Sequence, residues 1–461
     1  MLQKYDLIVI GAGTSGFSAS IKANEIGSKT LLINDDRVGL GGTCVNVGCV
    51  PTKFMLNIAE MVSLKRRKKF SGLSVDVEFD LKKIVEEKDK LVESLRRENE
   101  NVLETLEKVT FLKGEAKFIS RNEILVGTEI YSGDKFIIST GSSSLIPPIK
   151  GISEVDFITS REALDLKEVP ERILIIGSGA VGIEFAEIFN NFGSVVYLVD
   201  MKKRILPNLD KDISEFYLKI LQDKGIEVFT GSKVKEIFKK DKVFVVRILV
   251  NGKIEEIEVE KVMIAAGRKP NTDSLGLENV DLRTGKNGEI LVDEYLRSND
   301  YIFAAGDVIG GYMLETVAAR EGMIAANNAL SCSGEFMKMD YSIVPQVIFS
   351  EPKIASVGLK EDEIIDKGIN YEKRILNLDT LPKAKILKKE SGMIKILVEK
   401  ETEKILGIHI VSPNADEVIH SGVFTLKNKL KLNEVVNTLF VFPTFSEILK
   451  LACQSFSQGY K

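Results

Sequence analysis

The sequence predicts an α/β protein with two Rossmann-like dinucleotide-binding domains and a C-terminal α+β domain. Two observations support this prediction. A glycine-rich loop between an apolar strand and a helix occurs twice, and alternating strands replace that pattern after about residue 341. A chain of 461 residues is also too long for one hydrophobic core, so about three domains are expected.

The first glycine-rich unit lies at the N-terminus. An apolar strand at residues 5–10 runs into Gly11, Gly13 and Gly16 in the G-x-G-x-x-G spacing, and a helical pattern and a second strand at residues 30–33 follow. In such a unit the first glycine makes a tight turn and the second lets the backbone approach a pyrophosphate. The third lets the helix pack on the strand. The unit therefore predicts a dinucleotide site.

The same order returns in the middle of the chain. A strand at residues 173–176 leads into Gly177, Gly179 and Gly182, and Asp200 follows the next strand. Asp200 stands at about the spacing where an acid bonds a ribose 2′-hydroxyl. Two such units in one chain predict two dinucleotides.

Two further strands lead into polar residues. Residues 262–266 run into Gly267 and Arg268, and a buried strand at residues 301–306 leads to Asp307. In open α/β sheets ligands sit at the C-terminal ends of the strands, which makes Asp307 a candidate ligand-binding residue.

The rest of the chain divides into a charged helical part and a C-terminal part. Residues 57–108 predict an exposed or partner-facing helical hairpin with a solvated charged face. Near the C-terminus, strands at residues 393–398 and 405–411 precede helical stretches at 415–430 and 446–456, which predicts the α+β domain.

Cys44 and Cys49 have four residues between them and lie between a Gly-Gly-Thr segment and a Pro-Thr-Lys segment that ends at Lys53. A pair this close can form a disulfide if the first turn of a helix holds both side chains on neighbouring faces. In a cytosolic chain such a pair is more often catalytic or metal-binding, and zinc would need further ligands nearby, which do not follow. We therefore interpret the pair as a redox dithiol.

Composition excludes several classes of function. The chain has 44% hydrophobic and 28% charged residues and a net charge of -4, which gives no case for a nucleic-acid partner. No apolar run is long enough to span a bilayer, and the apolar stretch near the N-terminus ends in glycines, unlike a secretory leader. We expect a cytoplasmic protein without a membrane partner.

Taken together, these motifs resemble the class I pyridine nucleotide-disulfide oxidoreductases, the family of dihydrolipoyl dehydrogenase, glutathione reductase and mercuric reductase. The resemblance spans essentially the whole chain. It implies FAD on the first unit, NAD(P) on the second, and a homodimer in which each active site is completed by the other subunit. The domains expected are 1–147 (FAD-binding, first part), 148–268 (NAD(P)-binding), 269–336 (FAD-binding, second part) and 337–461 (dimerisation).

The resemblance also implies the roles of the catalytic residues. Cys49 would face the flavin and Cys44 would exchange with the substrate, a small-molecule or protein-bound disulfide or dithiol. Lys53 would approach the flavin ring and pair with Glu184. A thiolate is the reactive species, and a helix N-terminus together with a nearby cation lowers the pKa of a thiol.

The cofactor-binding residues follow in the same way. Asp307 would bind the FAD ribityl chain, and Met313, Leu314 and Thr316 would line the flavin. Backbone groups of Ala116 and Val234 would meet the adenine ends of FAD and NAD. The further cofactor-binding residues implied by matching motifs are Gly42, Thr43, Thr140, Gly141, Gly267 and Arg268.

Two departures concern the cofactors. Asn34 occupies the position that usually carries a glutamate for the FAD ribose, and an amide can still bond a hydroxyl. Lys202, Lys203 and Arg204 follow Asp200. The acid favours NAD, whereas the basic run could accept a 2′-phosphate, so NADP stays open.

A third departure concerns the acid–base residue. The family's disulfide reductases carry a His-Pro-x-x-x-Glu segment, whose histidine is the general acid and base. Here Phe442 replaces the histidine while Glu447 remains. Positioned acid–base catalysis is typically worth about 10²–10⁴-fold. Of the two histidines in the chain, His409 is expected in the core of a strand, and His420 is not expected to replace the base.

These observations leave three functions open. The leading one is a dihydrolipoyl dehydrogenase-like NAD(P)H:disulfide oxidoreductase. The alternative is a mercuric-reductase-like metal reductase, which Phe442 favours. That class delivers metal with a C-terminal cysteine pair, whereas Cys453 stands alone and is expected to be packed, and Cys332 is expected to be a loop thiol. No resident metal site is expected. The third is a redox-sensing flavoprotein without turnover.

Overall fold

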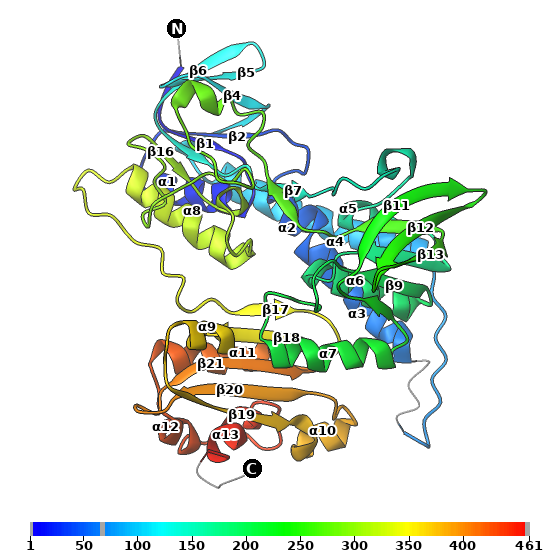
Figure 1. Ribbon diagram of the computed structural model, residues 1–461. Helices are drawn as coiled ribbons and strands as arrows, with labels where there is room; N and C mark the ends of the chain where they lie inside the picture. Colours follow the sequence, from blue (N-terminus) through cyan, green and yellow to red (C-terminus); the bar gives the residue numbers. More distant parts are fainter. Residues whose placement is uncertain (1–2, 65–69, 457–461) are drawn as a thin grey trace.

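The computed structural model describes residues 3–64 and 70–456, and its first layer is a seven-stranded sheet in the order β3-β2-β1-β6-β5-β4 with β16 beside β6 (Figure 1). β1, β2, β3, β6 and β16 run parallel, whereas β4 and β5 form an antiparallel extension. β16 is distant in sequence, so the chain returns to this sheet after building another one. The bounds are β1 Gln3–Ile10, β2 Thr30–Asn34, β3 Val109–Lys113, β4 Ala116–Ser120, β5 Glu123–Val126, β6 Glu129–Ile138 and β16 Ile302–Ala304.

Two helices, α1 (Thr14–Ile26) and α8 (Glu315–Ala329), pack closely on this sheet. A Cβ at Gly322 would lie 2.0 Å from the carbonyl oxygen of Ser15, so the helices approach to backbone contact there. The core beneath α1 is apolar, with Leu7, Val9 and Leu32 fully buried. This burial on both faces explains the continuous apolar runs of the parallel strands.

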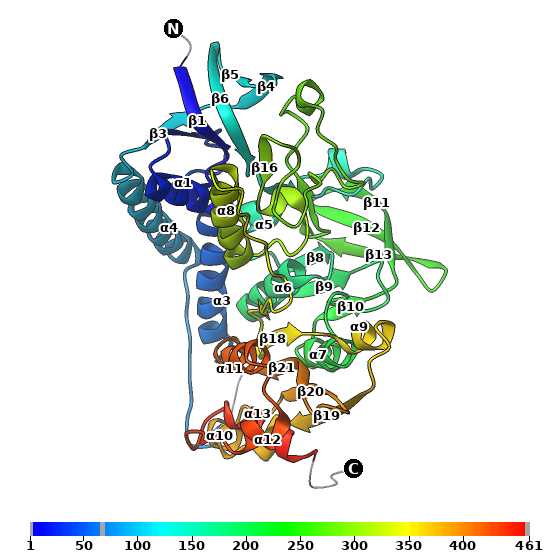
Figure 2. The same cartoon turned by 90° about the vertical axis from the view of Figure 1, so that its left-hand side faces the viewer.

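The second glycine-rich unit builds the parallel sheet β10-β9-β8-β14, and an antiparallel sheet β11-β12-β13 lies beside it (Figure 2). α6 (Ala180–Phe192) is buried along almost its whole length and packs against α3 (Cys49–Ser63), whereas α7 (Lys211–Asp223) buries one face. The strands are β8 Arg172–Ile176, β9 Val195–Val199, β10 Glu227–Phe229, β11 Lys233–Lys240, β12 Val243–Val250, β13 Lys253–Val259 and β14 Lys261–Ile264.

The C-terminal part is an antiparallel sheet in the order β17-β18-β21-β20-β19 with helices packed on it. α11 (Ala415–Lys427) packs on β18 and β21, and α13 (Glu447–Gln454) packs on β19 and β20. The predicted α/β class with an α+β C-terminal part is confirmed. The remaining bounds are β17 Gln346–Ile348, β18 Lys353–Gly358, β19 Tyr371–Asn377, β20 Met393–Glu399, β21 Ile405–Ser412, α9 Glu361–Asp366, α10 Pro382–Leu387 and α12 Leu432–Val436.

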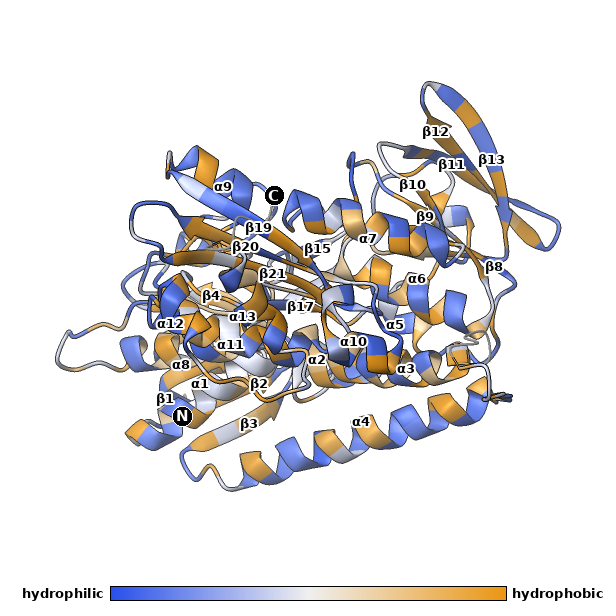
Figure 3. Ribbon diagram, turned by 90° about the horizontal axis from the view of Figure 1, so that it is seen from below, coloured by the Kyte–Doolittle hydropathy of each residue, from blue (hydrophilic) through white to orange (hydrophobic). Residues whose placement is uncertain are grey.

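The charged segment forms α3 and a long helix, α4 (Leu81–Glu104), joined through residues 70–80 without regular structure. Residues 65–69 lie outside the described part. Figure 3 shows α4 as mostly hydrophilic with apolar residues at intervals. The prediction of a solvated charged face has one exception, because Lys88 is buried and its Nζ donates to Asp165 Oδ1 (2.6 Å) and the Leu164 carbonyl (3.1 Å).

The domain bounds 1–147, 148–268, 269–336 and 337–461 remain a prediction. Within residues 3–64 and 70–456, no helix combines the length and apolarity needed to cross a bilayer.

Candidate functional site

The predicted site residues gather around two adjoining cavities of about 220 and 210 Å³, at the C-terminal ends of β1 and β6. Gly13, Thr43 and Gly141 line both cavities. Of the predicted residues, the first is also lined by Gly11, Asn34, Gly42, Ala116 and Thr140, and the second by Cys44, Cys49, Lys53, Glu184, Arg268, Asp307, Met313 and Leu314. These residues come from distant parts of the chain, so the fold brings together what the motifs predicted.

Cys44 and Cys49 lie on different helices, α2 (Gly42–Val47) and α3, and not together on the first turn of one helix, the arrangement that the sequence analysis considered for a disulfide. Gly48 separates the helices, and Cys49 is the first residue of α3. Both cysteines are free thiols. Because Cys49 stands at the N-terminus of a 15-residue helix, the helix dipole favours a thiolate there.

The two thiols share a hydrogen bond that divides their acidity. The hydrogen bond from Cys44 and the positive charge of Lys53 lower the pKa of Cys49 to about 7, although burial acts in the opposite direction. The same bond and burial raise the pKa of Cys44. The thiolate of the reduced pair therefore resides on Cys49, the cysteine expected to face the flavin.

Lys53 pairs with Glu184 as predicted. Its Nζ lies 3.0 and 2.9 Å from the two carboxylate oxygens, and the Glu184 side chain is only 6% exposed. Phe349 begins a stretch, Phe349–Gly358, that belongs to the motifs of the resemblance, but the sequence analysis gave it no role at this site. Its backbone N–H donates to Glu184 Oε1 (3.0 Å) and its ring lies 4.8 Å from Lys53 Nζ. Its position, 165 residues after Glu184, gave no local signal of this contact.

The first cavity fits the pyrophosphate and ribose of FAD. A Cβ at Gly16 would lie 1.8 Å from the Gly11 carbonyl oxygen, whereas one at Gly13 would meet no heavy atom nearer than 3.8 Å. Gly16 therefore serves helix packing and Gly13 leaves space for a ligand. Asn34 Oδ1 accepts the Ala12 N–H (3.2 Å), while its buried Nδ2 has no protein partner and remains a donor for a hydroxyl.

Asp307 belongs to a small network that the sequence did not reveal. Ser142 Oγ donates to Asp307 Oδ2 (2.5 Å), and Arg268 donates to the hydroxyl and the carbonyl oxygen of Ser142 (both 2.6 Å). Ser142 follows the predicted Thr140 and Gly141 directly, and β7 (Ser142–Ser144) pairs with β15 (Arg268–Pro270). The strand pairing orients Arg268 and Asp307 on one wall of the second cavity.

The second glycine-rich unit has the same internal packing as the first. A Cβ at Gly177 would lie 2.2 Å from the Ala265 carbonyl oxygen and one at Gly182 1.9 Å from the Gly177 carbonyl oxygen, whereas Gly179 has open space. Asp200 Oδ2 accepts both the N–H and the hydroxyl of Ser178 (each 2.7 Å). The acid is therefore held against the glycine-rich loop, where a ribose is expected.

Some predicted residues do not line the two cavities. Gly16 is packed behind the first, Thr316 is exposed on α8, and Gly267 precedes Arg268 with a positive φ of 121°. Val234 is buried at the start of β11, and Glu447 starts α13, where its Oε2 accepts the Thr444 N–H (2.9 Å). Glu447 does not line the cleft of its own chain, as expected if it acts in a dimer.

Phe442, at the position of the family's acid–base histidine, lies in an exposed apolar segment. Phe442 is 68% exposed, beside Val441 at 76% and Leu439 at 94%. His409 is buried in β21 as expected, with Nε2 bonded to the Leu359 carbonyl oxygen (3.1 Å), and burial lowers its pKa. His420 is exposed on α11. Cys453 is buried and Cys332 exposed, in accord with their expected places.

Comparisons with known proteins match this arrangement. Residues 5–322 match the family described as pyridine nucleotide-disulphide oxidoreductase, and residues 344–453 match its dimerisation domain. Mercuric reductase of Staphylococcus aureus is 40% identical over 458 residues, covering 98% of this chain and 83% of the relative. Dihydrolipoyl dehydrogenase 1 of Arabidopsis thaliana is 35% identical, covering 98% and 90%. The flavoprotein disulfide reductase RclA of Escherichia coli, solved as a Cu(II) complex, superposes with a TM-score of 0.88 at 27% identity, covering 98% and 99%.

Proposed function

Because this chain belongs to the pyridine nucleotide-disulphide oxidoreductase family, whose members bind FAD and NAD(P)H, we propose that its electron acceptor is a thiophilic metal ion bound by Cys44 and Cys49. This is the alternative of the sequence analysis, and it replaces a dihydrolipoyl dehydrogenase-like function as the leading one. Mercuric reductases at 38–40% identity support the change, since dihydrolipoyl dehydrogenases stand at 34–35%.

The observation that carries this proposal is Phe442 in place of the acid–base histidine. Both histidines of the chain are accounted for elsewhere, His409 inside a sheet and His420 on the surface of α11. Exchange with a disulfide needs a proton donor for the leaving thiol, which phenylalanine is unable to supply. A metal ion needs no such donor, because its binding releases thiol protons to solvent.

The chain's own groups support this chemistry. The pKa of Cys49 is lowered to about 7, so near neutral pH a large share of the molecules offer a soft cation one sulfur that is already deprotonated. Binding of the cation lowers the pKa of the second thiol, on Cys44, and completes a two-sulfur site. When bound, FAD would accept the hydride of NAD(P)H and would pass its two electrons to the oxidised Cys44–Cys49 pair or to the metal ion that the two sulfurs hold. One hydride carries the two electrons that reduce one Hg(II) ion to neutral metal.

A disulfide reductase is the second candidate. Glu447, the partner of the missing base, is retained and is held at the start of α13 by Thr444. The dithiol suits this activity as well, and dihydrolipoyl dehydrogenases are among the relatives at lower identity, 34–35%. It would require another group, contributed by the second subunit, to protonate the leaving thiol.

Three finer expectations belong to the proposal. NAD is the expected nucleotide because of Asp200, while Lys202 and Lys203 are exposed and keep NADPH open. A homodimer is expected because the chain carries the family's dimerisation domain. The exposed apolar loop around Val441 and Phe442 suits contact with a second copy. A cytoplasmic location stays a prediction.

The test is steady-state oxidation of NADH and of NADPH by the flavin-loaded protein, with Hg(II) plus excess thiol, Cu(II), lipoamide and oxygen as separate acceptors. If the proposal holds, the wild type turns over with a metal ion as acceptor. Cys44→Ser and Cys49→Ser lose this turnover, while NAD(P)H still reduces their flavin. Lipoamide turnover that exceeds metal turnover would establish the second candidate. Flavin reduction without turnover on any acceptor would indicate a redox sensor.

A further inference from the structure

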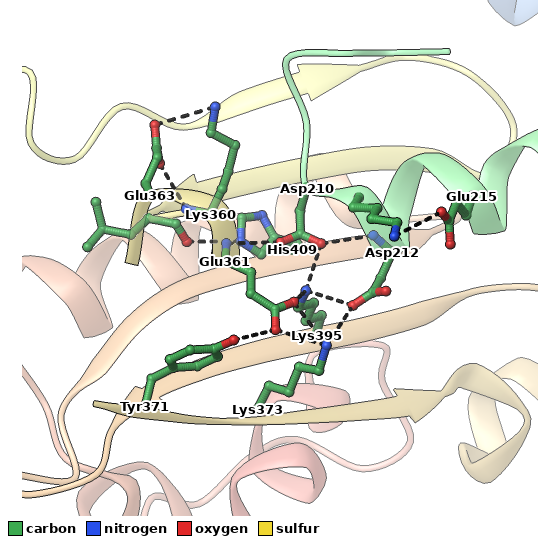
Figure 4. Close-up of polar contacts among 12 residues, drawn as sticks. Asp210, Asp212, Glu215, Lys360, Glu361, Glu363, Tyr371, Lys373, Lys395 and His409 are labelled. Carbon is green, nitrogen blue, oxygen red and sulfur yellow. Dashed lines mark hydrogen bonds and ion pairs between the residues drawn. The ribbon is translucent and has the colours of Figure 1, made fainter. Parts of the chain in front are cut away.

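A buried cluster of charges joins the second glycine-rich unit to the C-terminal sheet (Figure 4). Lys395 of β20 is fully buried, and its Nζ lies 2.8 Å from Asp210 Oδ1 and 2.7 Å from Asp212 Oδ2. The same Nζ also pairs with Glu361, the first residue of α9. Oxygens of the three carboxylates lie within 4.8 Å of one another, so the ammonium occupies the place that a cation would take.

The cluster holds one end of the connection between β9 and α7, residues 201–210. Asp210 caps α7 by accepting the Asp212 N–H (3.0 Å), and its Oδ2 accepts the Glu361 N–H (3.2 Å). Lys360 Nζ donates to the Asn208 carbonyl oxygen (3.3 Å). This end of the connection is therefore fixed mainly by residues of the C-terminal part.

The other end of the connection is attached to the glycine-rich loop. The Leu206 N–H donates to the Ser178 carbonyl oxygen (2.9 Å), and the Lys202 carbonyl oxygen accepts the Gly231 N–H (2.7 Å). Lys203 and Arg204 lie between these two anchors, and Lys202 is one of them. The basic segment expected to meet the nucleotide ribose is therefore held at Lys202 and Leu206, and the Lys395 cluster supports the residues that follow it, up to Asp210.

We propose that Lys395 is a positioning residue for nicotinamide dinucleotide binding, which it serves from the C-terminal sheet by holding the connection 201–210 in its binding conformation. The inference rests on the proposed use of NAD(P)H by this chain. Removing the ammonium leaves three carboxylates close together, Asp210 buried and the other two partly buried, and their repulsion drives the N-terminus of α7 away from β20. The freed connection then spends only part of its time in the conformation that binds the nucleotide.

The experiment compares Lys395→Met with Lys373→Met. Lys373 contacts the same Asp212 (3.5 Å) and Glu361 (2.9 Å) but is 43% exposed and does not hold Asp210. The KM values for NADH and NADPH are expected to rise about tenfold in Lys395→Met, as for a connection that is competent about one-tenth of the time, with kcat little changed. Lys373→Met should resemble the wild type, and Lys395→Arg should restore most of the affinity.

A second readout does not depend on turnover. Trypsin cuts after Lys202, Lys203 and Arg204, and cleavage there, identified by mass spectrometry, should be faster in Lys395→Met. Asp210→Asn preserves the helix cap and weakens the ion pair, so it should change both readouts in the same direction even if Lys395→Met does not fold. Flavin-loaded variants with wild-type KM values and wild-type cleavage would overturn the proposal.

The design separates this inference from the proposed function. Direct NADH binding, followed by the fluorescence of NADH, reports nucleotide affinity whatever the electron acceptor is. If the wild type binds neither NADH nor NADPH, the proposed function fails, and the cleavage rates alone still decide whether Lys395 holds the connection. A lower melting temperature with unchanged KM and cleavage would mean a purely structural role and would also reject the inference.

Discussion

Lys53 and Glu184 form a partly buried ion pair, with Nζ 3.0 and 2.9 Å from the two carboxylate oxygens, that joins α3 to α6. One residue follows the redox dithiol and the other follows the second glycine-rich loop, so the pair connects the two expected nucleotide sites. Phe349 adds a backbone donor to Glu184 and a ring beside Lys53. Glu184 thereby fixes the cation that stabilises the Cys49 thiolate.

The first prediction concerns this cation. In Lys53→Met the pKa of Cys49 should rise from about 7, because the charge of Lys53 is one of the effects that lower it. The thiolate absorbance of the reduced protein, titrated in the ultraviolet, measures the shift, and Lys53→Arg serves as the control that keeps a charge. An unchanged titration would mean that the hydrogen bond from Cys44 alone stabilises the thiolate.

The second prediction concerns Phe442. Phe442→His should raise lipoamide turnover at least tenfold, since a positioned base contributes about 10²–10⁴-fold, and should leave metal turnover unchanged. The side chain is 68% exposed in the single chain, so the change should cost little core packing. Phe442→Leu is the matched control. No gain in lipoamide turnover would show that the pocket has been rebuilt for another acceptor.

The third prediction separates the roles of two glycines. Gly16→Ala places a Cβ 1.8 Å from the Gly11 carbonyl oxygen, so the apoprotein should lose roughly 1–3 kcal/mol or more of unfolding free energy. Gly13→Ala meets nothing nearer than 3.8 Å and keeps an ordinary backbone conformation (φ -72°). It should leave apoprotein stability near wild type but reduce FAD retention, because its methyl group occupies the cavity. Thermal unfolding of apoprotein and flavin content after dialysis measure both; equal stability of the two variants would contradict the assignment.

The fourth prediction concerns acid. Burial would raise the pKa of Glu361, but hydrogen bonds from Lys395, Tyr371 and Lys373 hold it at about 2, below the ordinary 4.5. A lowered pKa means that the ionised carboxylate stabilises the fold above pH ~4.5 and that this contribution disappears as the pH falls toward about 2. Glu361→Gln does not titrate, so its urea midpoint should fall less steeply between pH ~5 and ~3. Parallel curves for the two proteins would refute this assignment.

The sequence by itself determined the fold class, both glycine-rich units and the dithiol. These features depend on local patterns: an apolar run, glycines at set spacing and cysteines in a short frame. The Lys53–Glu184 pair, which joins residues 131 apart, was predicted only through the family resemblance. It also placed His409 in a strand and Asp307 at the end of one. The sequence also shows Phe442 in place of the family's histidine. This substitution indicated a metal ion as electron acceptor, and the relatives at higher identity are mercuric reductases.

The tertiary structure decided what depends on contacts between distant segments. Phe349 reaches Glu184 across 165 residues, Ser142 couples Arg268 to Asp307, and Lys395 meets Asp210 across 185 residues. The division of the dithiol between α2 and α3 was also decided by the structure, since the sequence analysis considered only a single helix turn for both cysteines. Burial of a charge becomes favourable only when its partners arrive from other elements, and no spacing along the chain records which partners those are.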